Sequence, residues 1–186
     1  MYTIGIDLGG TNIVASVVND EYKIIATSKT PTNSPRSADE IFDDIAEVCE
    51  EAVKSAGLTM DDIESVGMGT PGTVNADGII EFANNLAFNN VPARTMLAKR
   101  LNKPEEKVFI ENDANCAALG EAKAGVGNGA KDFVAVTLGT GVGSGVIIDG
   151  KIVNGVNYAG GECGHMVILV DGDQCSCGRR GCWEAY

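Results

Sequence analysis

The sequence has few basic residues and no long apolar run. Its 186 residues include 14 Lys and Arg but 26 Asp and Glu, which gives a formal net charge of -12. Nucleic-acid binding depends on clustered Lys and Arg that neutralise phosphates, so we expect no nucleic-acid partner. No apolar run approaches the roughly 18 residues of a membrane span, and residues 1–7 lack the basic and apolar regions of a signal peptide. We therefore expect a cytoplasmic protein with no membrane partner.

Two common nucleotide-binding signatures are also missing. The sequence has no Walker loop, and no G-x-G-x-x-G loop leads from a strand into the helix of a Rossmann unit. The chain has one histidine and six cysteines. Because cytoplasmic cysteines are kept reduced, clustered cysteines in such a chain indicate a metal site rather than a disulfide framework.

The segment from Gly161 to Glu184 places the histidine near three cysteines. The four residues are His165, Cys175, Cys177 and Cys182. One imidazole and three thiolates complete a tetrahedral zinc shell and leave no position for water, so we predict a structural zinc ion. Gly178 and Gly181 permit a tight turn before the last cysteine. The alternative is a group of reactive thiols, or a disulfide, beside an unrelated histidine.

Two glutamates, Glu162 and Glu184, flank the predicted zinc ligands. A folded zinc knuckle would turn both carboxylates, and the far side of the His165 ring, toward one ligand rich in hydroxyl groups. Residue type alone favours the alternative that both are ordinary surface glutamates.

The chain is predicted to open with three antiparallel strands. The first is Tyr2–Leu8, the second is Ile13–Val18, and the third lies around Tyr22–Thr27. A glycine turn, residues 9–12, joins the first two strands. A capping box at residues 37 and 40 then begins a helix whose apolar residues recur at helical spacing until a glycine at position 57.

Further elements follow along the chain. We predict strands at Ile63–Met68 and Val108–Ile110 and an alanine-rich helix from about Ala114 to Ala124. A second glycine hairpin joins a strand at Phe133–Leu138 to one at Val146–Ile148. This repeat of the opening pattern favours two similar halves that face one cleft.

The paired glycine turns are candidate phosphate sites. A turn without side chains exposes successive backbone N–H groups, which form a concave nest for phosphate oxygens. Thr11, Asn12 and Thr140 add side-chain donors. A single glycine hairpin is typical of an ordinary turn, whereas two matched hairpins favour phosphate binding.

Five motifs carry a resemblance that covers the whole chain in order. They are Asp7–Asn12 (DLGGTN), Glu111–Asn115 (ENDAN), Leu138–Gly143 (LGTGVG), Gly161–His165 (GECGH) and Cys175–Glu184 (CSCGRRGCWE). Together they resemble the ROK family, which includes bacterial glucokinases. The resemblance implies an α/β, actin-like ATPase (ribonuclease H-like) fold, with mixed sheets, flanking helices and a cleft between two domains. It also implies a small domain over residues 1–112, the first part of a larger domain over residues 113–186, and ATP-dependent phosphorylation of a hexose, most commonly glucose.

The resemblance also implies roles for single residues. Asp113 becomes the general base that takes a proton from the 6-hydroxyl of the sugar, although its position also suits capping of the following helix. Asp7 helps to hold Mg²⁺. The implied sugar contacts are Gly69, Asn85, Asn112, Glu162, His165 and Glu184. The implied ATP phosphate contacts are Gly9, Gly10, Thr11, Asn12, Gly139, Thr140 and Gly141. His165 binds zinc through one nitrogen and a sugar hydroxyl through the other, whereas Asn85 also fits an ordinary loop asparagine.

The sequence departs from the family pattern in three ways. Phe88 stands where tryptophan is usual, and Cys163 replaces an aliphatic residue. The chain ends at Tyr186, whereas similar kinases continue through the larger domain, so we expect a truncated kinase with little activity of its own. Full-length relatives imply a homo-oligomer.

Several alternatives stay open at this point. The substrate could be another hexose or an N-acetylhexosamine, and the donor could be polyphosphate instead of ATP. A sugar-sensing ROK regulator shares these motifs behind a winged helix, but the first strand here begins at Tyr2. A non-catalytic actin-type scaffold would not explain the joined sugar and zinc motifs.

Overall fold

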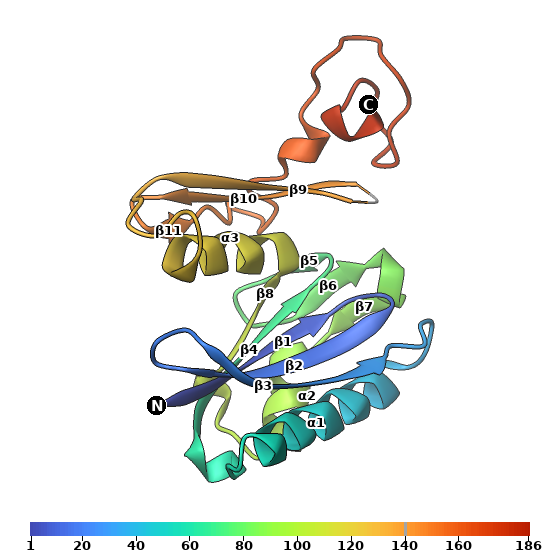
Figure 1. Cartoon of the computed structure of the whole chain (residues 1–186). Coiled ribbons are helices and arrows are strands. Elements are labelled where there is room, and N and C mark those ends of the chain that lie inside the picture. The colour runs from blue at the N-terminus through green and yellow to red at the C-terminus, as the bar shows by residue number, and fades with distance from the viewer. Residues whose placement is uncertain (140) are drawn as a thin grey trace. The chain divides into compact units, whose positions relative to one another are not determined.

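The computed structural model describes residues 1–139 and 141–186. Thr140, a predicted phosphate contact, lies outside the described residues. The chain divides into two compact units, Met1–Asp113 and Ala114–Tyr186. Figure 1 shows the helices and strands of each unit.

The first unit is built on a five-stranded mixed sheet in the order β3-β2-β1-β4-β8. Its strands are β1 (Tyr2–Leu8), β2 (Asn12–Asn19), β3 (Ile24–Pro31), β4 (Ile63–Thr70) and β8 (Val108–Asn112). Strands β1, β2 and β3 are antiparallel, which confirms the predicted opening, while β4 pairs in parallel with both β1 and β8. The third strand begins and ends later than predicted.

Two helices, α1 (Ala38–Ser55) and α2 (Ala93–Arg100), cover one face of this sheet (Figure 1). The predicted capping box is present, since the Ser37 side chain accepts from the Glu40 N–H and the Glu40 carboxylate accepts from the Ser37 N–H. The apolar face of α1 packs on alternate strand residues in one core. That core includes the fully buried side chains of Ile4, Leu8, Ile13, Ile41, Phe42, Ile45 and Met68.

The sequence analysis missed helix α2 and a small antiparallel sheet. This sheet contains β5 (Thr73–Val74), β6 (Ile80–Ala83) and β7 (Phe88–Val91). Strands of two to four residues are too short to show an alternating pattern, and the apolar residues of α2 do not recur at a sustained helical spacing. The short 3₁₀ helices are η1 (Met60–Asp62), η2 (Asn84–Leu86), η3 (Glu105–Lys107), η4 (Cys163–His165) and η5 (Trp183–Ala185).

The second unit contains helix α3 (Asp113–Ala124, of which the first residue belongs to the first unit) and a three-stranded antiparallel sheet. The sheet order is β11-β10-β9, with β9 at Phe133–Leu138, β10 at Val142–Ile148 and β11 at Lys151–Ile152. The β9–β10 pairing confirms the second hairpin. A Cβ atom on Gly145 of β10 would lie 2.5 Å from Ala118 Cβ of α3, so glycine permits this close helix contact.

The other face of this sheet is exposed within the described part of the chain. Val134, Val136 and Leu138 alternate along β9 and are 56%, 41% and 77% exposed. Alternation places these three side chains on one face, away from the partly covered residues of the strand. No other described element of the second unit covers this apolar face.

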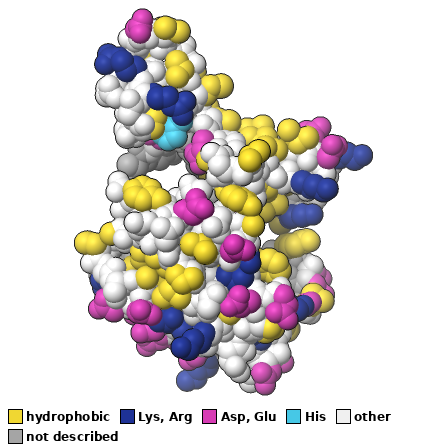
Figure 2. Space-filling view, turned by 180° about the vertical axis from the view of Figure 1, so that it is seen from behind, with side chains coloured by type: hydrophobic (Ala, Val, Ile, Leu, Met, Phe, Trp, Pro, Cys, Tyr) yellow, Lys and Arg dark blue, Asp and Glu magenta, His cyan; other side chains and the backbone are white. Residues whose placement is uncertain are grey.

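Two surface features bear on possible partners. No described helix has the length and apolar character needed to span a membrane. On the face drawn in Figure 2, Lys and Arg side chains form small separate groups, with Asp and Glu side chains scattered among them.

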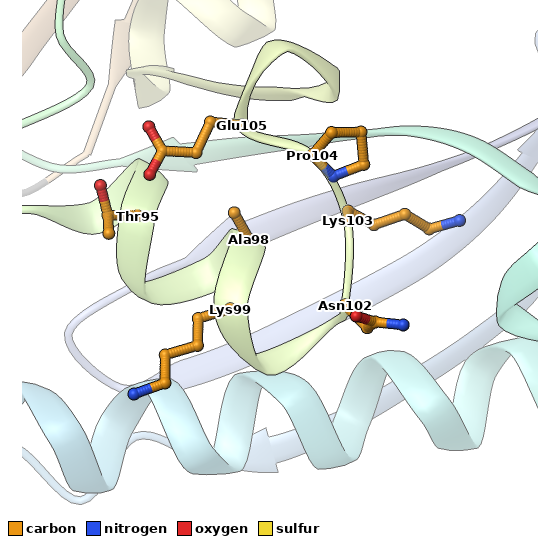
Figure 3. Close-up of a pocket in the computed structure, with 7 residues that line it drawn as sticks. All are labelled: Thr95, Ala98, Lys99, Asn102, Lys103, Pro104 and Glu105. Carbon is orange, nitrogen blue, oxygen red and sulfur yellow. The ribbon is translucent and has the colours of Figure 1, made fainter.

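An open depression lies between α2 and the segment that follows it. Its lining residues are Thr95, Ala98, Lys99, Asn102, Lys103, Pro104 and Glu105. The two lysine side chains point to opposite sides (Figure 3), and Lys103 Nζ donates to the backbone carbonyls of Met60 and Ile63. The depression contains none of the predicted site residues, and its charged groups do not converge.

Candidate functional site

The carboxyl ends of three parallel strands bring predicted site residues together in the first unit. Asp7 of β1 is paired in register with Gly69 of β4, and the next residue of β4, Thr70, is paired with Asn112 of β8. Asp113 follows directly as the first residue of α3. Ligand sites of α/β sheets form at this edge, because loops of different strands meet there.

Asp7 and Asp113 interact electrostatically at this edge. Desolvation raises the pKa of Asp7 above its ordinary value, and the negative charge of Asp113 adds to the rise. The two carboxylates therefore disfavour each other when both are ionised. A bound divalent cation would remove this repulsion, so the pair fits the predicted Mg²⁺ role of Asp7.

We expect Asp7→Asn to raise the midpoint of thermal unfolding at pH 7. A raised pKa means that the folded chain binds this proton more tightly than the unfolded chain, so ionised Asp7 weakens folding at neutral pH. The gain should disappear below about pH 3, where the carboxyl is protonated in both states. Circular dichroism melts at both pH values measure it, with the exposed turn variant Asp20→Asn as control. A variant that melts at or below the wild-type temperature at pH 7 would contradict the repulsion.

The first glycine loop lies directly beside the predicted sugar residue Asn85. The Gly9 N–H donates to the Asn12 carbonyl at 2.9 Å, which closes the turn. A Cβ atom on Gly10 would lie 3.4 Å from Asn85 Cβ, so the η2 segment packs on the loop. The structure thus brings Gly9, Gly10, Thr11 and Asn12 together with Asn85 inside one unit.

Asn112 is held by the segment after β4. Its Nδ2 donates to the Gly72 carbonyl at 3.1 Å, and its N–H donates to Glu111 Oε1 at 2.8 Å. Gly72 has φ +95°, and a Cβ atom there would lie 2.0 Å from the Phe82 carbonyl oxygen, so only glycine fits. The Asn112 side chain is therefore bound to a backbone segment whose conformation is fixed at Gly72.

The four predicted zinc ligands of the second unit lie together. One ligand atom from each of His165, Cys175, Cys177 and Cys182 lies within 4.8 Å of all the others. Cys177 Sγ is 3.6 Å from Cys182 Sγ, and Cys175 Sγ is 3.7 Å from His165 Nδ1. Two sulfur ligands about 2.3 Å from one zinc ion at the tetrahedral angle lie about 3.8 Å apart. The observed spacing fits this shell, and all six cysteines are free thiols instead of disulfides.

Tight turns shape the backbone around these ligands. Gly178 has φ +88° and Gly181 has φ +73°, both in the left-handed region that favours glycine. The Gly178 N–H donates to the Cys175 carbonyl, and the Cys175 N–H donates to the Arg179 carbonyl. Since the histidine nitrogen that faces the thiols is Nδ1, Nε2 lies on the other side of the ring.

The cysteines differ in how readily they ionise. A hydrogen bond from the Arg179 backbone N–H lowers the pKa of Cys177 to about 7. Burial raises the pKa of Cys182 to about 11, and the neighbouring thiols contribute further. A cation among them would favour the thiolate form of every cysteine ligand, because metal binding requires deprotonated sulfur.

The structure places both flanking glutamates close to the β10 strand. Glu184 Oε2 accepts from the Val142 N–H at 3.1 Å, and Glu184 Oε1 accepts from Ser176 Oγ at 3.1 Å. Glu162 precedes η4, whose Cys163 N–H donates to the buried Ser144 Oγ at 2.9 Å. The sequence analysis missed Ser144, which belongs to none of the five motifs, and Ser176, which lies between two cysteines of the last motif but has no ligand chemistry that singles it out.

The second glycine loop connects β9 to β10. The Gly139 N–H donates to the Gly141 carbonyl at 3.0 Å. A Cβ atom on Gly141 would lie 2.3 Å from Glu184 Oε2, so this loop also lies against a residue that is predicted to bind the sugar. In each unit, therefore, a glycine loop contacts a residue that is predicted to bind the sugar.

Comparison with known proteins decides the family. The sequence profile described as ROK family matches residues 3–186. The chain belongs to the ROK family. It has the actin-like ATPase fold of the ROK glucokinases, which confirms the predicted fold class.

Individual relatives include both enzymes and regulators. A glucokinase of Streptomyces coelicolor is 40% identical over 185 residues, which cover 99% of this chain and 55% of that protein. A xylose repressor of Caldicellulosiruptor bescii is 36% identical over 191 residues, which cover 98% of this chain and 45% of the repressor. The solved ROK glucokinase of Streptomyces griseus, in complex with glucose and AMPPNP, has a TM-score of 0.84 and 40% identity, over 100% of this chain and 57% of that one. The chain thus spans about half the length of these relatives.

Proposed function

We propose that this chain forms part of a kinase that transfers a phosphoryl group from ATP to a hexose, with glucose as the main substrate. Residues 1–112 would form its small domain, and residues 113–186 would form the first part of its larger domain. The 40% identity to a glucokinase and the structural similarity to a glucokinase that binds glucose and AMPPNP support this proposal.

One observation carries the proposal. The strand ends of the first unit gather Asp7, Asn112 and Asp113 in the unit that contains the Gly9–Asn12 loop. Asp113 would accept the proton of the sugar 6-hydroxyl as that oxygen attacks the γ-phosphorus, while Asn112 holds a neighbouring hydroxyl. Asp113 is the first residue of α3, and a modest base suffices because the transition state is loose.

Backbone N–H groups would bind the nucleotide. Gly9 to Asn12 in the first unit, with Gly139 to Gly141 in the second, would donate to phosphate oxygens. Asp7 would hold Mg²⁺, which when bound neutralises charge on the phosphates. Gly9, Gly10, Gly139 and Gly141 have no side chain of their own beside their N–H groups.

The remaining predicted residues would hold the sugar. Glu162, Glu184 and His165 Nε2 would bind hydroxyl groups, with Gly69 and Asn85 from the first unit. Zinc bound to His165 Nδ1 would fix the orientation of the imidazole ring. With four protein ligands, the zinc ion would have no open position for the substrate and so no Lewis-acid role.

The test is a sugar panel with the full-length protein. A coupled assay would compare glucose, mannose, galactose and N-acetylhexosamines, each with ATP or polyphosphate as donor. We expect the highest kcat/KM for glucose with ATP. Absence of phosphorylation for every sugar and donor would overturn the proposal.

The similarity to a xylose repressor supports a second candidate, a sugar-sensing regulator. Such a protein would bind a sugar through the residues around His165 but would not need Asp113 as a base. Calorimetry that shows sugar binding, together with an assay that shows no phosphorylation, would favour the regulator.

We expect the 186 residues alone to have little kinase activity. They correspond to about half of the kinase relatives, and the β9 face of the second unit is exposed. Phosphoryl transfer depends on positioning of the donor, so turnover should be at least about 1,000-fold below that of the full-length protein. The same assay on both lengths measures this, and comparable turnover would show that these residues suffice.

A further inference from the structure

Thr32 is a fully buried polar residue that follows β3, and no predicted role accounts for it. Its side chain is 0% exposed. Thr32 Oγ1 donates to the Gly9 carbonyl at 2.7 Å, and the Thr32 N–H donates to the Thr11 carbonyl at 2.9 Å. Two carbonyls of the four-residue glycine loop are therefore bound to one residue.

This arrangement orients the loop. In a trans peptide the C=O and the following N–H point in opposite directions. Since the Gly9 carbonyl faces Thr32, the Gly10 N–H faces away from it. An anion nest needs N–H groups directed outward and carbonyls directed away from the anion, because a carbonyl oxygen repels phosphate oxygens.

Thr32 is itself connected to helix α1. Its carbonyl accepts from Arg36 Nε at 3.0 Å and from Arg36 Nη2 at 2.8 Å, and Arg36 forms an ion pair with Asp44 of α1. Hydrogen bonds thus run from a core helix through Arg36 and Thr32 to Gly9. The loop has rigid support despite its glycines.

The same segment also contacts the predicted sugar residue. Ser34 Oγ donates to the Asn85 carbonyl at 2.9 Å, and Asn85 packs on Gly10. The segment from Thr32 to Arg36 therefore contacts both the glycine loop and the η2 segment.

We propose that Thr32 is a positioning residue whose hydroxyl holds the Gly9 carbonyl so that the Gly10 N–H is presented to a phosphate of the nucleotide. The phosphate part rests on the proposed kinase function. The orientation of the loop does not, and it can be tested in the free chain.

The first experiment uses the 186-residue chain without ligand. Thr32→Val removes the hydroxyl at nearly constant shape, and Thr27→Val is the matched control, since its hydroxyl bonds to Ser16 on the same strand pair. We expect ¹⁵N order parameters at Gly10 and Thr11 to fall from about 0.85 to below about 0.6 in Thr32→Val only. Unchanged order parameters and chemical shifts at these amides would overturn the proposal.

A second pair keeps the test decisive if Thr32→Val does not fold. Thr32→Ser and Thr32→Ala both remove the γ-methyl group, but only serine keeps the hydroxyl. Rigid loop amides in the serine variant and mobile ones in the alanine variant would support the proposal. Equal mobility in the two variants would contradict it.

The second experiment separates this inference from the kinase function. Full-length wild type and Thr32→Val would be titrated with Mg·AMPPNP and, separately, with glucose. We expect the affinity for AMPPNP to fall about tenfold, because one hydrogen bond that orients the loop is lost. The affinity for glucose should change by less than about twofold. Equal AMPPNP affinity would overturn the positioning role. Wild type that binds no AMPPNP would refute the kinase proposal and the phosphate part with it, while the order parameters still decide the loop orientation.

Discussion

In the full-length protein, Asp113→Asn is expected to lower kcat by about 100-fold to 10,000-fold, because the amide cannot accept the proton of the sugar hydroxyl. Sugar affinity should change little, since asparagine keeps the shape of the side chain. Steady-state kinetics with glucose would measure kcat, and calorimetry would measure the affinity for glucose.

The choice of asparagine separates two roles of this residue. Asp113 is the first residue of α3, where a carboxylate gains typically only about 0.3–1 kcal/mol from the helix dipole, so asparagine should leave the helix largely intact. If Asp113 served only the helix, Asp113→Asn would leave turnover near normal. Helical content measured by circular dichroism is the control, and it should match that of the wild type.

Removal of zinc is expected to unfold the segment around residues 161–186. Within this segment the described elements are two 3₁₀ helices of three residues each and isolated bridges, and the large apolar side chains from Met166 to Val170 are exposed, so little apolar core would hold it without a metal. In zinc-finger peptides the binding free energy is about 10–16 kcal/mol and is coupled to folding. Metal analysis should find one zinc per chain, and a chelator should lower the thermal unfolding temperature of the second unit.

Cys177→Ser tests the same site without a chelator. Cys177 is exposed, so loss of packing cannot explain a large effect of this substitution. We expect loss of zinc and of ordered amide signals after residue 161. Cys49→Ala is the control, because Cys49 is buried in the first unit and should leave the zinc content unchanged. Full zinc occupancy and an unchanged melting temperature in Cys177→Ser would refute the zinc knuckle.

The sequence by itself determined the features that depend on neighbouring residues. The capping box of α1 and the two glycine hairpins were predicted correctly, because each involves residues only a few positions apart. The four candidate zinc ligands could be named for a similar reason, and the structure brings them together. Cysteine and histidine have distinctive ligand chemistry, and three of the four lie within eight residues of one another in the sequence. The family followed from five motifs that occur in order along the chain.

Only the tertiary structure decided which distant residues meet. Asp7, Gly69 and Asn112 are far apart in sequence, and the register of three parallel strands aligns them at one edge. No local pattern specifies that register, since it depends on strand order and on the packing of the whole core. The supports of the site were equally hidden. Thr32 lies 23 residues from Gly9, and Ser144 lies 19 residues from Cys163, so the hydrogen bond of each hydroxyl becomes visible only in the folded chain.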